Sequence, residues 1–273
     1  MVGQKPVRIW LEETKHLGMA LGLANTAKTV EALQLPSSLF TTVHVAGSNG
    51  KGTTCAMLCT ALTNQGVSNL LFSSPHLVRV EERIRINGVP VHADVMNRAL
   101  EAVRTATSAS SITVTFFEVT FLASLIIAHE AGVEMLILET GLGGRLDATR
   151  VSKADVCILT SIALEHTDVL GSQRTKIARE KAAIARAYCP LIVRNPDDPE
   201  VLESIEDTAS NAGMELLGEE IGPADLVVVD IPIGTSYRDE AKLLVDAVWP
   251  HLAGVNTQLE PDTSNCIWPA RMH

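Results

Sequence analysis

A glycine-rich loop constrains this chain more than any other feature of its sequence. It follows the apolar run 42–46, leads into a helical pattern over 53–65, and reads Gly47-Ser48-Asn49-Gly50-Lys51-Gly52-Thr53-Thr54. In a strand–loop–helix unit the loop N–H groups point at an anion, the helix N-terminus adds about half a positive charge, and a lysine adds a whole one. We therefore expect these residues to hold a nucleoside triphosphate, with Lys51 as a catalytic cation.

The loop is a variant of the usual phosphate-loop pattern G-x-x-x-x-G-K-[ST]. Gly47 lies three residues before Gly50, and Gly52 separates Lys51 from the hydroxyl residue, which gives G-[ST]-N-G-K-G-[ST]. The alternative interpretation is an ordinary tight turn. Glycines, an asparagine, a lysine and threonines together between a strand and a helix favour the nucleotide site.

Composition indicates a globular protein with an aliphatic core. The 273 residues are 46% hydrophobic but only 4% aromatic, which suits a buried parallel sheet in one large or two small domains. The net charge of −10 argues against nonspecific nucleic-acid binding, which needs a basic surface. No apolar stretch approaches the ~18 residues of a membrane span, and the first ten residues lack the apolar core of a signal peptide.

The five cysteines are scattered along the chain. Cys55 and Cys59 share a helix face and could suggest a metal site, but without paired ligands nearby they are better interpreted as small core residues. We expect a monomeric cytoplasmic protein that binds small molecules and neither nucleic acid nor membrane.

Apolar runs alternate with helical patterns along most of the chain, which predicts an α/β fold with a mostly parallel sheet and helices on both faces. An Asn-Gly pair at 87–88 predicts a hairpin. The expected strands are 42–46, 70–72, 135–138, 156–160, 191–193 and 226–229; the expected helices are 12–35, 53–65, 93–106, 116–130, 173–188 and 200–211.

Polar residues follow several of these strands, at the edge where an open parallel sheet binds ligands. A triphosphate site needs Mg²⁺, which prefers oxygen ligands. Glu139 ends an apolar strand and is a candidate ligand, Ser74 offers a hydroxyl, and His166 follows the next strand along. The alternatives are a capping or salt-bridging role for Glu139, a turn role for Ser74 and a loop histidine at 166.

Lys181 lies in the charged helical pattern 173–188. Its spacing alone favours a solvated helix face, because the adjacent Glu180 cannot pair with it on the helix surface.

Taken in order, several segments resemble one enzyme family. The resemblance covers about residues 20 to 195 and rests on His44–Thr53, Ser73-Ser74-Pro75-His76-Leu77, Glu82–Gly88, Phe116-Phe117-Glu118-Val119-Thr120, Leu138–Thr149, Leu159–Ile162, His166–Gly171 and Ile177–Ala182. The chain resembles folylpolyglutamate synthase and dihydrofolate synthase, members of the Mur ligase superfamily. This implies the P-loop NTPase-like fold of the Mur ligase central domain.

The resemblance also implies roles for single residues. Ser74, Glu139 and His166 match positions that hold Mg²⁺, in a site with a pair of ions. Lys181 matches a lysine that is carbamylated in this family, which replaces the solvated-face interpretation. Carbamylation turns a cation into a carboxylate that can hold the second metal.

Phe117, Asp147 and Ala148 match positions near the pterin of the folate substrate. The implied reaction is ATP-dependent ligation of L-glutamate to a folate or dihydropteroate carboxylate through an acyl phosphate. The substrates are thus small molecules: ATP, glutamate and a pteroate or folate.

The resemblance thins beyond Arg194, and the family's helix with a His-Gln and Asn-Ala pattern is not recognisable in 234–252. Residues 1–254 are expected to form the ATP-binding domain, and 255–273 a linker toward a C-terminal domain absent from this chain. The alternatives are a noncatalytic nucleotide- or folate-binding remnant, or another Mur-type amide ligase.

Overall fold

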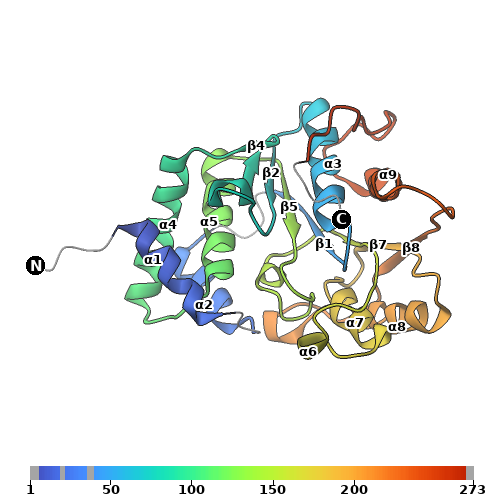
Figure 1. Cartoon of the computed structure of the whole chain (residues 1–273), viewed down its shortest axis with the longest axis horizontal. Helices are drawn as coiled ribbons and strands as arrows, with labels where there is room; N and C mark the ends of the chain where they lie inside the picture. The colour runs from blue at the N-terminus through green and yellow to red at the C-terminus, as the bar shows by residue number, and fades with distance from the viewer. Residues whose placement is uncertain (1–5, 19–21, 36–39, 269–273) are drawn as a thin grey trace, which may run out of the picture.

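The computed structural model describes residues 6–18, 22–35 and 40–268 (Figure 1). Within them, eight strands form one sheet in the order β4-β3-β2-β5-β1-β6-β7-β8. The strands are β1 (Thr41–Ala46), β2 (Asn69–Phe72), β3 (Ile84–Ile86), β4 (Val89–Pro90), β5 (Met135–Glu139), β6 (Val156–Leu159), β7 (Pro190–Arg194) and β8 (Asp225–Val229). All neighbours are parallel except β3, which pairs antiparallel with β2 and β4. The predicted mostly parallel sheet is confirmed.

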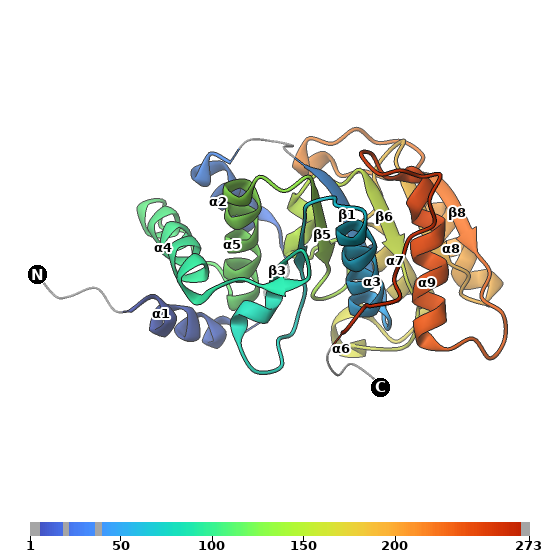
Figure 2. The same ribbon diagram turned by 90° about the horizontal axis from the view of Figure 1, so that it is seen from above.

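Helices cover both faces of this sheet (Figure 2). They are α1 (Val7–Glu13), α2 (Ala24–Leu33), α3 (Lys51–Asn64), α4 (Ala93–Ala109), α5 (Phe116–Ala131), α6 (Thr167–Leu170), α7 (Arg174–Ala182), α8 (Pro199–Ala209) and α9 (Tyr237–Val248), with short 3₁₀ turns η1 (Thr14–Leu17), η2 (Val80–Arg83), η3 (Ala148–Val151), η4 (Glu215–Leu217) and η5 (Trp249–His251). None of these helices is both long and apolar enough to cross a membrane.

The buried strands carry apolar side chains on both faces, as expected for a sheet between two helix layers. Val43 and Val45 of β1 pack toward α3 and α9, whereas Ala46 packs toward α7 and α8. The neighbouring strands alternate in the same way, and Leu136 and Leu138 of β5 pack toward α4 and α5. The core is aliphatic, and Cys55 and Cys59 belong to it.

The single helix expected over 12–35 is wrong. The structure has α1 and η1 before Gly18 and a separate α2 that begins at Ala24. Gly18 has φ 65° and Gly22 has φ 145°, and neither value fits a right-handed helix. The apolar spacing continued through the break, but glycine backbone freedom ended the first helix. The Asn87-Gly88 hairpin is confirmed by the pairing of β3 with β4.

The segment 255–268 contains no helix or strand within the described residues, yet it is hydrogen bonded along α3 and α9. Asn64 Nδ2 donates to Asp262 O at 2.9 Å, and the Gln65 side chain exchanges bonds with Asn256. The indole N–H of Trp249 donates to Leu259 O at 2.9 Å. That this segment leads to a further domain stays a prediction.

Candidate functional site

The phosphate loop joins the end of β1 to the start of α3, and residues after β6 hold its backbone in place. Ser48 N donates to Ser161 O at 2.7 Å, and the Thr160 hydroxyl donates to Asn49 O at 2.7 Å. Gly47 has φ 145°, and a Cβ there would collide with the Thr160 hydroxyl. The loop therefore needs glycine at 47 for both conformation and space.

Two lysines converge on the carbonyl of Gly47. Lys51 Nζ donates to Gly47 O at 2.8 Å, and Lys181 Nζ donates to the same oxygen at 2.9 Å. Lys181 also forms an ion pair with Glu165 at 2.6 Å and is 1% exposed. The solvated-face interpretation of Lys181 from spacing is therefore wrong, because α7 docks this side of the helix against the phosphate loop.

The environment shifts the pKa of both partners of this ion pair. Burial lowers the pKa of Lys181, although Glu165 opposes the shift. Burial also acts to raise the pKa of Glu165, but the hydrogen bond and charge of Lys181 lower it overall. From the sequence we assigned Glu165 no role of its own, although it follows β6 and precedes His166 at the same edge as the loop.

Glu139 and Ser74 meet at the carboxyl ends of β5 and β2. The Glu139 side chain is fully buried, and its Oε2 accepts the Ser74 backbone N–H at 3.2 Å. The hydroxyls of Thr140 and Thr54 are buried and lack a hydrogen-bond partner among the described residues. Carboxylate and hydroxyl oxygens suit Mg²⁺, and unpaired buried hydroxyls suit a polar ligand, so these residues fit a metal–nucleotide site.

His166 begins α6 in a left-handed conformation with φ 45°, and its side chain is exposed. Among the described residues, no three His, Cys, Asp or Glu side chains form a ready-made metal cluster. The predicted ligand set contains only two such residues, with a serine hydroxyl as its third member. The role of His166 therefore stays a prediction.

A cavity of about 500 Å³, which we call the aromatic cavity, lies beside Ser74. The predicted substrate residues Phe117, Asp147 and Ala148 all line it. The Asp147 carboxylate is buried and organises the backbone: Oδ2 accepts the N–H groups of Gly141 and Leu142, each at 2.8 Å. The structure thus brings the three residues together, with Asp147 bound to protein groups.

Phe116 forms a further wall of the aromatic cavity, and cations lie over its ring. Lys15 Nζ is 4.9 Å and the Arg83 guanidinium 5.0 Å from the ring centre. Arg83 Nε donates to His76 Nδ1 at 2.9 Å, and burial together with the charge of Arg83 lowers the pKa of His76. This end of the cavity can therefore accept an anionic group. The sequence did not predict this anion-accepting end of the cavity, because Lys15 lies far from Arg83 and Phe116 along the chain.

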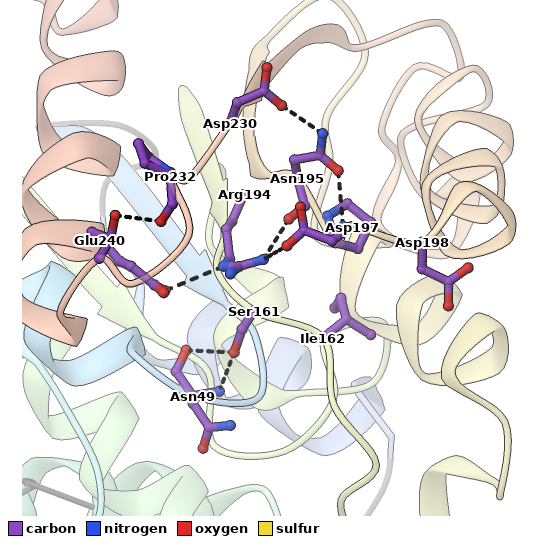
Figure 3. A network of polar contacts seen from close by, with 12 residues as sticks. Asn49, Ser161, Ile162, Arg194, Asn195, Asp197, Asp198, Asp230, Pro232 and Glu240 are labelled. Atoms are coloured by element: carbon purple, nitrogen blue, oxygen red, sulfur yellow. Dashed lines mark hydrogen bonds and ion pairs between the residues drawn. The ribbon is translucent and has the colours of Figure 1, made fainter.

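A second cavity of about 300 Å³, the loop cavity, lies beside the phosphate loop and includes Asn49 in its lining. Figure 3 shows Arg194 between the carboxylates of Glu240 and Asp197, with Asn49 bound to Ser161 nearby. Arg194 Nε lies 3.3 Å from Glu240 and its Nη1 lies 3.0 Å from Asp197. Sequence reasoning gave no role to these residues, because they come from β7, the loop after it and α9.

Comparison with known proteins supports the family. Residues 45–221 match the model of the Mur ligase middle domain, which is more than half of the chain. The chain belongs to the Mur ligase family. It is 39% identical over 211 residues to a dihydrofolate synthase/folylpolyglutamate synthase of Escherichia coli strain K12, covering 76% of this chain and 49% of that protein.

Solved structures of this family have the same fold. The structure of E. coli FolC in complex with DHPP and ADP has a TM-score of 0.82 at 30% identity, covering 98% of this chain and 68% of that one. A bifunctional folylpolyglutamate synthase/dihydrofolate synthase with Mn, AMPPNP and L-glutamate bound has a TM-score of 0.80 at 32% identity, covering 99% and 68%. The chain spans about half the length of the curated relatives it matches.

Proposed function

We propose that this chain carries the ATP-binding part of a ligase that joins L-glutamate to a folate or dihydropteroate carboxylate. The observation that carries the proposal is the arrangement at one edge of the sheet. The phosphate loop, the Lys181–Glu165 pair and the Glu139–Ser74 contact lie together, and Ser74 also lines the aromatic cavity. A relative with this fold has DHPP and ADP bound, and another has L-glutamate and AMPPNP bound.

In the proposed reaction the loop and Lys51 hold the phosphates of ATP, while the aromatic cavity orients the acid substrate. The substrate carboxylate attacks the γ-phosphorus and becomes an acyl phosphate, with ADP as the leaving group. The amine of glutamate then attacks the acyl carbon and displaces phosphate. The positive charge of Lys51 and the N–H dipoles of the loop backbone stabilise the transferring phosphoryl group.

Ser74, Glu139 and His166 would hold Mg²⁺, which neutralises phosphate charge in the transfer. We propose that Lys181 is carbamylated and contributes a further carboxylate for a second ion. The buried amine, whose pKa burial lowers, supports this, because only a neutral amine adds CO₂. The loop cavity, which Asn49, Gly50 and Thr54 help to line, has space and polar groups for the nucleoside. A cytoplasmic location and a monomeric state stay predictions from the sequence.

The second candidate is a nucleotide- or folate-binding protein without ligase activity of its own. The phosphate loop and the aromatic cavity by themselves provide for the binding of a nucleotide and of an acid. A Mur-type ligase for a different acid is separated from both by substrate competition.

The test is ADP formation by the pure protein with ATP, Mg²⁺, and dihydropteroate or a folate, with and without L-glutamate. The ligase proposal expects ADP release that depends on both the acid and glutamate, and that is absent in Lys51→Ala. Nucleotide binding without such release supports the noncatalytic candidate. Absence of both nucleotide binding and folate binding contradicts both candidates.

A further inference from the structure

A histidine lies buried in the central strand of the sheet, behind the aromatic cavity. His44 of β1 is 0% exposed, and its Nε2 lies 2.8 Å from the hydroxyl oxygen of Thr149 in η3. Its Nδ1 is buried without a hydrogen-bond partner among the described residues. Burial and the nearby charges of Arg186 and Arg150 lower the pKa of His44 well below its usual value. The imidazole is therefore neutral at physiological pH.

The hydrogen bonds fix the direction of donation through this group. The Thr149 hydroxyl donates to Asp147 Oδ1, which also accepts the Thr149 backbone N–H at 3.0 Å. Because the single hydroxyl proton goes to Asp147, the Thr149 oxygen accepts from His44, and the proton of the imidazole lies on Nε2. His44, Thr149 and Asp147 thus form a one-way chain of donors that ends on a carboxylate.

The second carboxylate oxygen of Asp147 binds the backbone of the loop that lines the aromatic cavity. Its Oδ2 accepts the N–H groups of Gly141 and Leu142. Gly141 packs so closely on the ring of Phe117 that a Cβ would lie 2.6 Å from it. In the middle of this loop, a Cβ on Gly144 would lie 2.8 Å from the carbonyl oxygen of Lys181. The loop 141–147 therefore lies between the aromatic cavity and the helix of Lys181, and a shift of Asp147 would move both walls.

We propose that His44 and Thr149 are positioning residues that hold Asp147 and, through it, the loop 141–147 against Phe117. Their role is to set the shape of the aromatic cavity, with no contact to the nucleotide. The identity of the cavity's ligand as a pterin acid rests on the proposed function; the positioning of the loop does not.

The first test is hydrogen–deuterium exchange of the unliganded chain in the segment 140–149. His44→Leu removes the donor, and His44→Gln keeps an amide N–H near the position of Nε2. The hydrogen bond that is lost joins two neutral groups, so exchange at 141 and 142 should rise about two- to tenfold in His44→Leu. His44→Gln should restore most of the protection. Ile205→Val in α8 is the control, since it removes a buried methyl outside the hydrogen-bonded chain of His44, Thr149 and Asp147.

The second test compares the binding of dihydropteroate and ATP by calorimetry. His44→Leu should weaken dihydropteroate about tenfold and leave ATP affinity unchanged, because the phosphate loop keeps its own contacts. Failure of the wild type to bind dihydropteroate would contradict the proposed function, while the exchange test would still decide the positioning role.

Unchanged exchange over 140–149 in His44→Leu would overturn the inference. The inference would also be overturned if His44→Leu exchanged faster over the whole chain, with the same pattern as the Ile205→Val control. Absence of rescue by His44→Gln would overturn it as well. Should His44→Leu fail to fold, Thr149→Val against Thr149→Ser makes the same comparison one bond closer to Asp147, and the same outcomes decide it.

Discussion

At the scale of single residues, Gly47 both shapes the backbone of the phosphate loop and binds two lysines through its carbonyl. Gly47 adopts φ 145° and lies against Thr160, while its carbonyl accepts both Lys51 and Lys181. Two cations on one carbonyl indicate a site that favours anionic ligands. Glu165 pairs with one of these cations, Lys181, at 2.6 Å.

The amine of Lys51 is expected to contribute more to nucleotide affinity than any exposed lysine. Lys51→Ala removes a charged donor worth about 1.5–3 kcal/mol, so we expect ATP to bind about ten- to a hundredfold more weakly. Isothermal titration calorimetry measures the affinity, with the exposed Lys153→Ala as the matched control. Equal affinity in Lys51→Ala and wild type would contradict the nucleotide assignment of the loop.

His44 should make the stability of the fold depend on pH. Its pKa in the folded state is lowered from 6.5, so the unfolded state binds the proton first as pH falls. Stability from this group is complete above pH 6.5 and declines below it, by up to about 1.4 kcal/mol per pH unit. Urea unfolding between pH 5 and 7.5 should show a shallower slope in His44→Gln than in wild type. Parallel curves would show that His44 does not titrate differently in the two states.

At the scale of elements, α5 shows how a local signal fixes a helix that shapes the site. Thr115 and Glu118 form a capping box: Thr115 Oγ1 accepts Glu118 N–H, and Glu118 Oε2 accepts Thr115 N–H at 2.7 Å. Glu118 is buried and also accepts the hydroxyl of Thr26 from α2 at 2.6 Å. The cap therefore fixes both the start of α5, where Phe116 and Phe117 lie, and its contact with α2.

Loss of the cap should destabilise the protein without a change in its core. Thr115→Ala is expected to lower the free energy of unfolding by about 1 kcal/mol, because the first turn of α5 loses a side-chain acceptor. Thr115→Ser keeps the hydroxyl and should remain within a few tenths of a kcal/mol of wild type. Chemical denaturation of the two variants measures this difference. Equal stability of Thr115→Ala and Thr115→Ser would contradict a capping role.

At the scale of the whole molecule, a buried charge cluster joins segments that are far apart in sequence. Glu219, after η4, accepts two bonds from Arg150 of η3 at 2.6 Å and pairs with Arg186 at 3.0 Å. Arg150 is fully buried, and burial lowers the pKa of Arg186 to about 10. The cluster joins the connection between α8 and β8, which contains Glu219, to η3 and to the segment of Arg186.

Removal of the Glu219 carboxylate should therefore destabilise the folded protein. Glu219→Gln leaves buried arginine charge uncompensated, and we expect a loss of about 3 kcal/mol in the free energy of unfolding. The neighbouring Glu220→Gln, on an exposed side chain, should change little and serves as the control. Urea denaturation measures both. A loss in Glu219→Gln no larger than in the control would show that the cluster is not structurally important.

Part of the candidate site could be predicted from local patterns. The end of β5 at Glu139 follows from an apolar run, and the loop after β1 from its glycines and lysine. The burial of Lys181 could not be predicted, because it depends on the docking of α7 against the carbonyl of Gly47. The pairing of Arg194 with Glu240 likewise joins residues whose separation in sequence carries no periodic signal.

The sequence by itself determined the mostly parallel α/β sheet, the phosphate loop and the family, because these depend on local backbone preferences and on motifs of contiguous residues. Only the tertiary structure decided that Asp147 is held from behind by Thr149 and His44, that Lys181 lies beside the phosphate loop with Glu165, and that Gly18 and Gly22 separate two helices. The physical reason is that burial and hydrogen-bond partners are set by contacts between distant segments, which form only when the sheet has brought its strands together.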